Sequence, residues 1–298
     1  MYTQFFGNYL LANGYVTQEQ LFSAMRRQAD KHIKLGTIAM HAGYMTASEV
    51  DTVYIRQTHE DRKFGELAIE EGFLSNEQTI ELLRLQVPDF LGLGQVFLDD
   101  GILTNTEFEN ILADYRSQNE LVDLDMLIEE PEAITKLFEN FLIVAETPIT
   151  HNGHMFTELL FNNFVRFVGE DYTPITVEEL TEFPAECCVK QEIKGNYSIV
   201  TYLAMDEETA IAFASRYAEE NFESYDEYVQ ASLEDFLNLH NGLFIVNVSN
   251  DSSTELSIGT PEHVEEPLLL FDHVTYHFPI LYTFGTVHFL IEAVKLDD

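Results

Sequence analysis

The stretch GTIAMHAGYMTASEVDTVYIRQ, residues 36–57, contains the pattern that decides the fold of the first third of the chain. It opens on Gly36, reaches a second glycine at Gly43, and continues to Thr46 and, three residues later, Glu49. A glycine often ends a helix because it adopts the left-handed conformation at no steric cost. A Thr followed three residues later by Glu forms the capping box that starts a helix. The stretch therefore predicts a short helix, a glycine turn and a second, capped helix.

The same pattern recurs with a period of 29 residues. The opening glycines are Gly7, Gly36, Gly65 and Gly94, and the second glycines are Gly14, Gly43, Gly72 and Gly101. The capping positions are Thr17, Thr46, Ser75 and Thr104, and the first three units close on Gln28, Gln57 and Gln86. One such unit is too small to bury its own apolar face, so neighbouring units must stack. We predict an all-α domain of four 29-residue helical repeats over residues 1–118.

This pattern resembles the N-terminal domain of the ATPases of type II secretion and type IV pili, the MshEN or GspE-N family. The resemblance implies cyclic di-GMP as a ligand, held by motifs that open on Arg-Leu-Gly and end in Gln. Here KLG at 34–36 and KFG at 63–65 stand at two such openings, so lysine replaces arginine. The implied ligand positions are Lys34, Leu35, Gly36, Gly43, Gln57, Lys63, Phe64, Gly65, Gly72 and Gln86. A second reading, in which the glycines are only helix caps and the apolar residues only core, stays open.

The second half of the chain has a different order of elements. We predict a linker or connecting helix over 119–153 and an α+β domain over 154–298. Its predicted helices cover 155–169, 207–221 after the cap Asp206, and 225–241 between the cap Ser224 and a terminating Gly242. Its predicted hairpins pair 186–193 with 197–205, 243–249 with 254–259, and 273–282 with 285–293. Such a segregated pattern favours an antiparallel sheet of about six strands with the helices on one face.

This order resembles the chemotaxis phosphatases CheX and CheC. In that family the second of two consecutive helices carries an acid, an Asn three residues on and a Gly four further on. The segment ASLEDFLNLHNG has Asp235, Asn238 and Gly242 at these positions, with Asp in place of the usual Glu. The resemblance implies two catalytic residues: Asn238 orients a water towards the phosphoaspartate of a CheY-like receiver, and Asp235 contacts the receiver's lysine. It also implies that Mg²⁺ arrives with the receiver and that this chain binds no cofactor of its own.

These patterns predict a bacterial protein of two-component, chemotaxis-type signalling that dephosphorylates a phosphorylated CheY-like receiver. The alternative is a receiver-binding adaptor without turnover, responsive to cyclic di-GMP through the repeats. A third reading is a structural partner of a secretion or pilus machine. The CheX resemblance also implies a homodimer.

Composition restricts the class of partner. The net charge is −37, with 15 Lys and Arg against 52 Asp and Glu, so the chain repels nucleic acid and anionic lipid. No apolar run reaches the roughly 20 residues of a membrane span, and no signal peptide is recognisable. The adjacent Cys187 and Cys188 form no disulfide framework, and His273 and His277 have no partner cluster that would predict a metal. We therefore expect a cytoplasmic protein without a metal site.

Overall fold

The structure is a computed structural model that describes residues 2–28, 31–85, 87–88, 90–118, 151–196, 198–252 and 255–295. The chain divides into two compact units, Met1–Leu137 and Phe138–Asp298. Most of the segment predicted as a linker or connecting helix, residues 119–150, lies outside the described residues. Within the described ranges, no helix is both long and apolar enough to cross a membrane.

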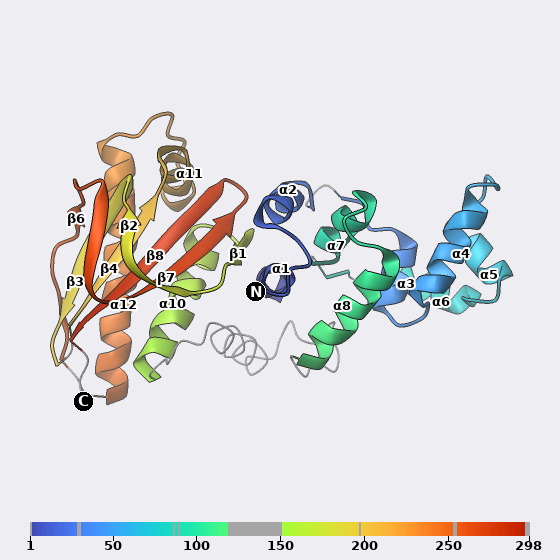
Figure 1. Cartoon of the computed structure of the whole chain (residues 1–298), viewed down its shortest axis with the longest axis horizontal. Coiled ribbons are helices and arrows are strands. Elements are labelled where there is room, and N and C mark those ends of the chain that lie inside the picture. The colour runs from blue at the N-terminus through green and yellow to red at the C-terminus, as the bar shows by residue number, and fades with distance from the viewer. Residues whose placement is uncertain are drawn as a thin grey trace. The chain divides into compact units, whose positions relative to one another are not determined.

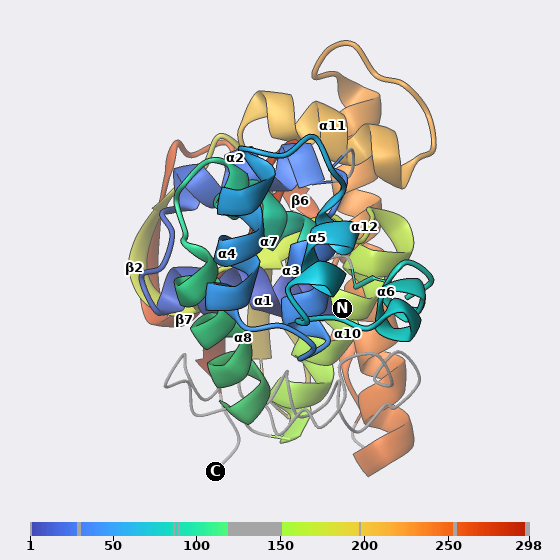
Figure 2. The ribbon, with the colours of Figure 1, turned by 90° about the vertical axis from the view of Figure 1, so that its right-hand side faces the viewer.

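The N-terminal unit consists of short helices, as the glycine pattern predicts (Figures 1 and 2). They are α1 (Tyr2–Ala12), α2 (Gln18–Gln28), α3 (Leu35–His41), α4 (Ala47–Gln57), α5 (Phe64–Glu70), α6 (Asn76–Leu82), α7 (Phe90–Asp99) and α8 (Asn105–Gln118). A glycine with positive φ follows α1, α3, α5 and α7, at Gly14, Gly43, Gly72 and Gly101. The core of the unit contains Phe6, whose ring packs against the rings of Phe90 and Tyr115.

Capping boxes start the second helix of each pair. Thr46 accepts a hydrogen bond from the backbone N–H of Glu49, and Glu49 Oε2 accepts from the backbone N–H of Thr46 at 2.8 Å. The same reciprocal bonds join Thr17 with Gln20, Ser75 with Gln78, and Thr104 with Glu107. The predicted capped helices are therefore confirmed.

The opening glycines have a different reason to recur. Gly36 lies inside α3, where a Cβ would come within 2.9 Å of Val50 Cγ1 and 3.1 Å of Phe64 Cζ. A Cβ on Gly65 would come within 3.2 Å of Leu35 Cδ2. These glycines allow α3 to lie close to α4 and α5. The first glycine of a unit thus serves close packing, and the second serves the turn.

The C-terminal unit is an α+β domain, as predicted. Its helices are α10 (His151–Phe167), α11 (Glu207–Tyr217) and α12 (Glu227–Ser252). Its strands are β1 (Tyr172–Pro174), β2 (Glu178–Pro184), β3 (Cys187–Lys194), β4 (Ser198–Met205), β5 (Ser257–Ile258), β6 (Glu262–His263), β7 (Leu268–Tyr282) and β8 (Gly285–Lys295). All strand pairs are antiparallel, in the order β1-β7-β8-β4-β3-β5, with β2 also on β7 and β6 on β3.

The helices lie against one face of this sheet (Figure 1). Alternate residues of β4 divide between the two faces, because Thr201 bonds to α12 whereas its neighbour Tyr202 joins a cluster on the opposite side. That second cluster includes Phe183, Phe271 and Leu290, so apolar side chains cover both faces of the sheet.

One predicted helix end and one predicted strand are wrong. Helix α12 continues through Gly242 to Ser252, and the predicted strand 243–249 is part of it. Buried Phe244 and Val248 extend the apolar stripe of the helix at a spacing of four residues. This packing outweighs the cost of roughly 1 kcal/mol for a glycine inside a helix.

Three further details differ from the prediction. The sheet has eight strands among the described residues, and three of them, the three-residue β1, the seven-residue β2 and the two-residue β6, are absent from the prediction. Only Ser257 and Ile258 of the predicted strand 254–259 form a strand. Asp226, not Ser224, starts α12, since its Oδ1 accepts from the backbone N–H groups of Tyr228 and Val229.

Two glycine substitutions should change stability in opposite directions. Gly43→Ala should destabilise the protein by about 1 kcal/mol, because its φ of 70° is unfavourable for alanine. Gly242→Ala should stabilise it by up to about 1 kcal/mol, because Gly242 is helical and a Cβ there meets nothing within 4 Å. Urea unfolding of the full chain measures both. A loss of stability in Gly242→Ala would contradict the continuous helix.

Acid should destabilise the C-terminal unit through His240. This side chain is 0% exposed, accepts from Asn163 Nδ2 at 3.1 Å, and burial lowers its pKa to about 3. Below pH 6.5 His240 binds a proton in the unfolded chain but stays neutral in the folded state. The free energy of unfolding therefore falls as the pH drops from about 6.5 towards 3. The expected loss between pH 6.5 and 4 is about 3 kcal/mol.

Urea titrations at each pH should therefore give a flatter pH profile for His240→Gln, which keeps an acceptor for Asn163 but cannot charge. Equal slopes for the wild type and this variant would exclude His240 as the source of the acid sensitivity.

Candidate functional site

Asp235 and Asn238, the predicted catalytic pair, lie one turn apart in the middle of α12. This helix packs on β3 and β4 and has α11 beside it. Asp235 is exposed and Asn238 is half-buried. Residues three apart share a side of a helix, so both belong to one surface. Their side chains, however, bond to different neighbours.

Asp235 is held by a tyrosine of the neighbouring helix. Tyr217, the last residue of α11, donates its hydroxyl to Asp235 Oδ2 at 2.6 Å. Burial, followed by this hydrogen bond, raises the pKa of Tyr217 well above its ordinary value, so the hydroxyl stays a donor at neutral pH. The other oxygen, Oδ1, bonds to none of the described residues. The bond to Oδ2 therefore fixes the position of the carboxylate, and Oδ1 is open to a partner.

Asn238 is held by a glutamine of the sheet. Gln191, on β3, donates from Nε2 to Asn238 Oδ1 at 2.8 Å. Asn238 Nδ2 donates to none of the described residues. The amide is thus attached to the fold through its oxygen.

Gln191 belongs to a buried polar network with Asn241 and Thr201. Its Nε2 also donates to the carbonyl oxygen of Gly259, and its Oε1 accepts from Asn241 Nδ2, both at 2.8 Å. Asn241 Nδ2 donates in addition to Thr201 Oγ1 at 2.8 Å. Gln191, Asn241 and Thr201 are each at most 1% exposed. The network therefore joins α12 to β3, β4 and the chain after β5.

Sequence reasoning missed Tyr217 and Gln191. Gln191 left a signal, because it stands between Val189 and Ile193 on the face of β3 that is otherwise apolar. A polar residue in such a position needs a buried partner. Tyr217 left none, since its distance from Asp235 is set by how α11 packs on α12.

A cavity of about 820 Å³ lies in the helical unit among α3, α4, α5 and α6. Its apolar lining is Leu35, Tyr54, Phe64, Ile69 and Leu83. The rings of Tyr54 and Phe64 are 5.1 Å apart and tilted by 54°. A large apolar cavity with aromatic walls is typical of a small-molecule site.

The structure places six of the ten predicted ligand positions on this cavity, and they are Lys34, Leu35, Gln57, Lys63, Phe64 and Gly65. Gly36 packs behind it against Val50 and Phe64. Gly43 and Gly72 only end helices, and Gln86 lies outside the described residues. Gln57 also has a structural role, because its Nε2 donates to the carbonyl oxygen of Arg62 at 3.0 Å.

Lys34 shares a single carboxylate with Lys31. Its Nζ lies 2.7 Å from Asp99 Oδ1, and Lys31 lies 2.6 Å from the other oxygen. Burial alone would raise the pKa of Asp99, but hydrogen bonds from Lys31, Lys34 and Gln95 lower it overall. Gln95 also fixes the backbone here, because its Oε1 accepts from the Lys34 N–H at 3.0 Å. Lys34 thus lines the cavity with its charge offset only in part, because one aspartate serves two lysines.

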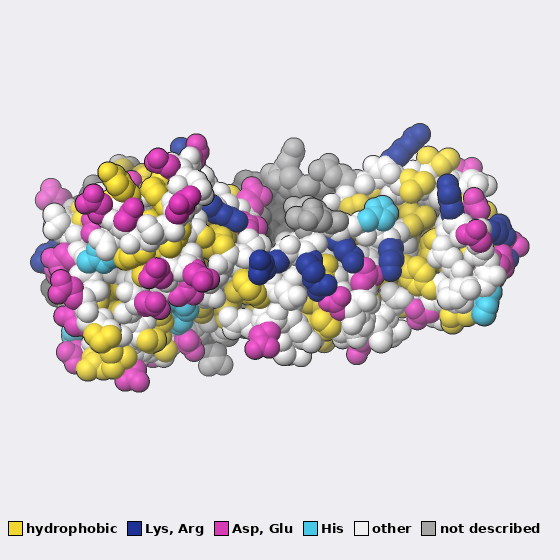
Figure 3. Space-filling view, turned by 90° about the horizontal axis from the view of Figure 1, so that it is seen from above, with side chains coloured by type: hydrophobic (Ala, Val, Ile, Leu, Met, Phe, Trp, Pro, Cys, Tyr) yellow, Lys and Arg dark blue, Asp and Glu magenta, His cyan; other side chains and the backbone are white. Residues whose placement is uncertain are grey.

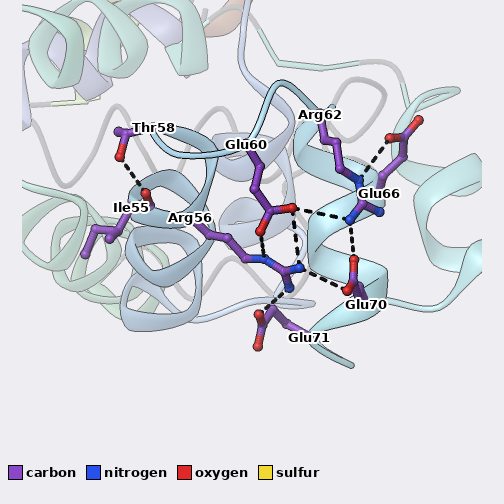
Figure 4. A network of polar contacts seen from close by, with 8 residues as sticks. All are labelled: Ile55, Arg56, Thr58, Glu60, Arg62, Glu66, Glu70 and Glu71. Atoms are coloured by element: carbon purple, nitrogen blue, oxygen red, sulfur yellow. Dashed lines mark hydrogen bonds and ion pairs between the residues drawn. The ribbon is translucent and has the colours of Figure 1, made fainter.

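Lys63, in contrast, has no ion pair with any described residue. It follows the loop that joins α4 to α5, and a network of ion pairs fixes that loop (Figure 4). Arg56 of α4 pairs with Glu60, Glu70 and Glu71, and Arg62 pairs with Glu60, Glu66 and Glu70. The exposed Lys63 therefore lines the cavity as a cation that no described carboxylate pairs with.

Charge is distributed unequally between the two units. Acidic side chains are scattered over the C-terminal unit, whereas Lys and Arg side chains gather over the helical unit (Figure 3). Residues 1–118 carry 9 Lys and Arg against 17 Asp and Glu, and residues 119–298 carry 6 against 35. An anionic ligand is therefore better placed at the helical unit.

No family model matches this chain, and no curated protein matches it. Solved structures similar to its C-terminal half include a chemotaxis protein CheX from Desulfovibrio desulfuricans. The sequence identity is 11% and the TM-score is 0.42. The match covers 48% of this chain and 99% of that chain. A CheC-like superfamily protein from Shewanella sp. PV-4 has 16% identity, 48% and 98% coverage and a TM-score of 0.43.

A third similar structure is the CheX–CheY–BeF₃–Mg²⁺ complex from Borrelia burgdorferi, with 16% identity, 46% and 94% coverage and a TM-score of 0.36. At such identities and TM-scores the likeness concerns only the course of the chain. The roles of Asp235 and Asn238 stay predictions.

Proposed function

We propose that the C-terminal unit binds a phosphorylated CheY-like receiver through α12. The observation that carries this proposal is that Asp235 and Asn238, one turn apart, are each fixed by a neighbour, Tyr217 and Gln191. Side chains that are already ordered lose less entropy on binding. Their spacing is the one that the CheX resemblance implies.

The two residues have separate parts in the proposed complex. Asp235 offers its open Oδ1 to the receiver's lysine, and Asn238 offers its amide to the phosphoryl group. Mg²⁺ arrives with the receiver, so this chain needs to supply only position and hydrogen bonds.

Hydrolysis of the receiver's aspartyl phosphate is the finer candidate at the same site. A water oxygen attacks phosphorus, the aspartate carboxylate leaves and inorganic phosphate is released. An amide oxygen has two lone pairs, and Asn238 uses one to accept from Gln191, so one is left to orient the water. Binding alone is the outcome if that lone pair cannot reach the attacking water.

Binding should depend on Asp235 and not on its neighbour. Asp235→Ala should weaken binding of a BeF₃-treated CheY-like receiver by about tenfold or more, because a charged hydrogen bond is lost. Glu234→Ala is the matched control, since one residue turns the side chain by about 100° around the helix. Calorimetry of the full chain and of both variants with a CheY-like receiver, with and without BeF₃, measures the affinity. Equal effects of the two variants would contradict the proposed surface.

The same proteins separate hydrolysis from binding. If the site is catalytic, the full chain should speed phosphate release from the phosphorylated receiver, and Asn238→Ala should remove that acceleration. Binding without acceleration would leave the adaptor function and reject the enzyme.

A second candidate function is cyclic di-GMP binding in the cavity of the helical unit. It is favoured by the convergence of six predicted ligand positions on one cavity of about 820 Å³. Tyr54 or Phe64 would stack on a base, and Lys63 would meet a phosphate.

Titration of the full chain with cyclic di-GMP tests this second function. Lys63→Ala should lower the affinity about tenfold, because it removes a lining cation that has no ion pair with the described residues. Arg84→Ala removes an exposed cation outside the cavity and should change little. No heat at high micromolar ligand would exclude the site.

A further inference from the structure

The hydrogen-bond partners around Asn238 determine which end of its side-chain amide is the oxygen. The chain of partners begins at Gly259, whose backbone carbonyl can only accept a hydrogen bond. The backbone carbonyl oxygen of Gly259 lies 2.8 Å from one end of the Gln191 side chain. Only an N–H can face a carbonyl oxygen, so this end of Gln191 is Nε2. The opposite end is then Oε1, which accepts from Asn241 at 2.8 Å.

This assignment carries over to Asn238. Gln191 Nε2 has two N–H groups, and the one not used on Gly259 points to Asn238 at 2.8 Å. The atom of Asn238 that faces it must accept, so it is Oδ1. Consequently Nδ2, with two donors and no acceptor among the described residues, is the end that Asn238 offers to a partner.

Gln191 itself has no alternative orientation. It is 1% exposed, and Asn241 holds its oxygen while donating also to Thr201. Thr201 in turn donates its hydroxyl to the backbone carbonyl oxygen of Gln191 at 3.2 Å, so it accepts from Asn241. Turning the Gln191 amide over would set its oxygen against that of Gly259 and break both bonds of Nε2.

We propose that Gln191 is a positioning residue that holds Asn238 with its NH₂ group towards the partner, so that the site selects a hydrogen-bond acceptor. As regards the partner, this inference rests on the proposed function. On a phosphorylated receiver the acceptors are the anionic phosphoryl oxygens, and an unphosphorylated receiver offers none of them. In the proposed complex Asn238 therefore donates to the phosphoryl group, while Asp235 contacts the lysine.

Two substitutions of Asn238 test the orientation in the full chain, without any partner. Asn238→Asp keeps an oxygen for Gln191 but cannot donate, whereas Asn238→Ala removes the acceptor. The readout is hydrogen exchange of the Gln191 side-chain NH₂, followed by NMR on amide-labelled glutamine near pH 6.5. Exposed Gln18 is the internal reference.

In the wild type, the Gln191 protons should exchange at least about tenfold more slowly than those of Gln18. Asn238→Asp should keep this protection within about twofold, and Asn238→Ala should lose about tenfold or more for one proton. If Asn238→Asp loses protection as Asn238→Ala does, Asn238 donates to Gln191 and the proposal is overturned. Should Asn238→Ala fail to fold, the Asp variant alone decides.

The receiver experiment then separates the two ideas. Asn238→Asp should weaken binding of the BeF₃-treated receiver about tenfold or more, because an acceptor replaces the donor. If no receiver binds the wild type, the proposed function fails, and the exchange data still decide the orientation. If receivers bind and Asn238→Asp binds as well as the wild type, the selection of an acceptor is wrong.

Discussion

The buried amide of Gln191 determines how the C-terminal unit presents its surface, because no part of that amide can reach water. Leaving one of its groups unpaired would cost about 1–3 kcal/mol, so the fold satisfies its oxygen and both N–H groups. The partners come from α12 and from the chain after β5, and this joins elements far apart in sequence. Because Gln191 binds Oδ1 of Asn238, the Nδ2 group of Asn238 is left for a binding partner.

A second buried glutamine has the same effect in the helical unit. Gln95 of α7 is 1% exposed, and its oxygen accepts from the Lys34 N–H and from the Thr37 hydroxyl, while its Nε2 donates to Asp99. The start of α3 is thereby attached to α7, although Lys34 has no side-chain cap of its own. In both units, an amide behind the surface fixes the residue at the surface. Asn238 and the start of α3 are therefore held in position before any ligand arrives.

These two cases mark how far the sequence could predict the molecule. The bond between Thr46 and Glu49 spans three residues, so a local pattern is sufficient to predict it. The bond between Asn238 and Gln191 spans 47 residues, and only the packing of α12 on β3 creates it. The family motif located Asn238 but could not tell which end of its amide faces outward. The predicted helix end at Gly242 is wrong because of such packing too. The local signal for a helix end is outweighed by the tertiary packing of the flanking apolar stripe.

The charge of the chain as a whole does not determine what the cavity of the helical unit can bind. At physiological ionic strength charges are screened over about 8 Å, so the groups that line the cavity matter more than the net charge of the chain. Locally, Lys34 shares one aspartate of α7 with Lys31, and the lining that contains Lys63 also contains one acid, Glu66. So little excess positive charge cannot hold a small anion such as inorganic phosphate tightly. Most of the binding free energy must come from apolar contact with Tyr54 and Phe64, which favours an anion that carries a large flat ring system.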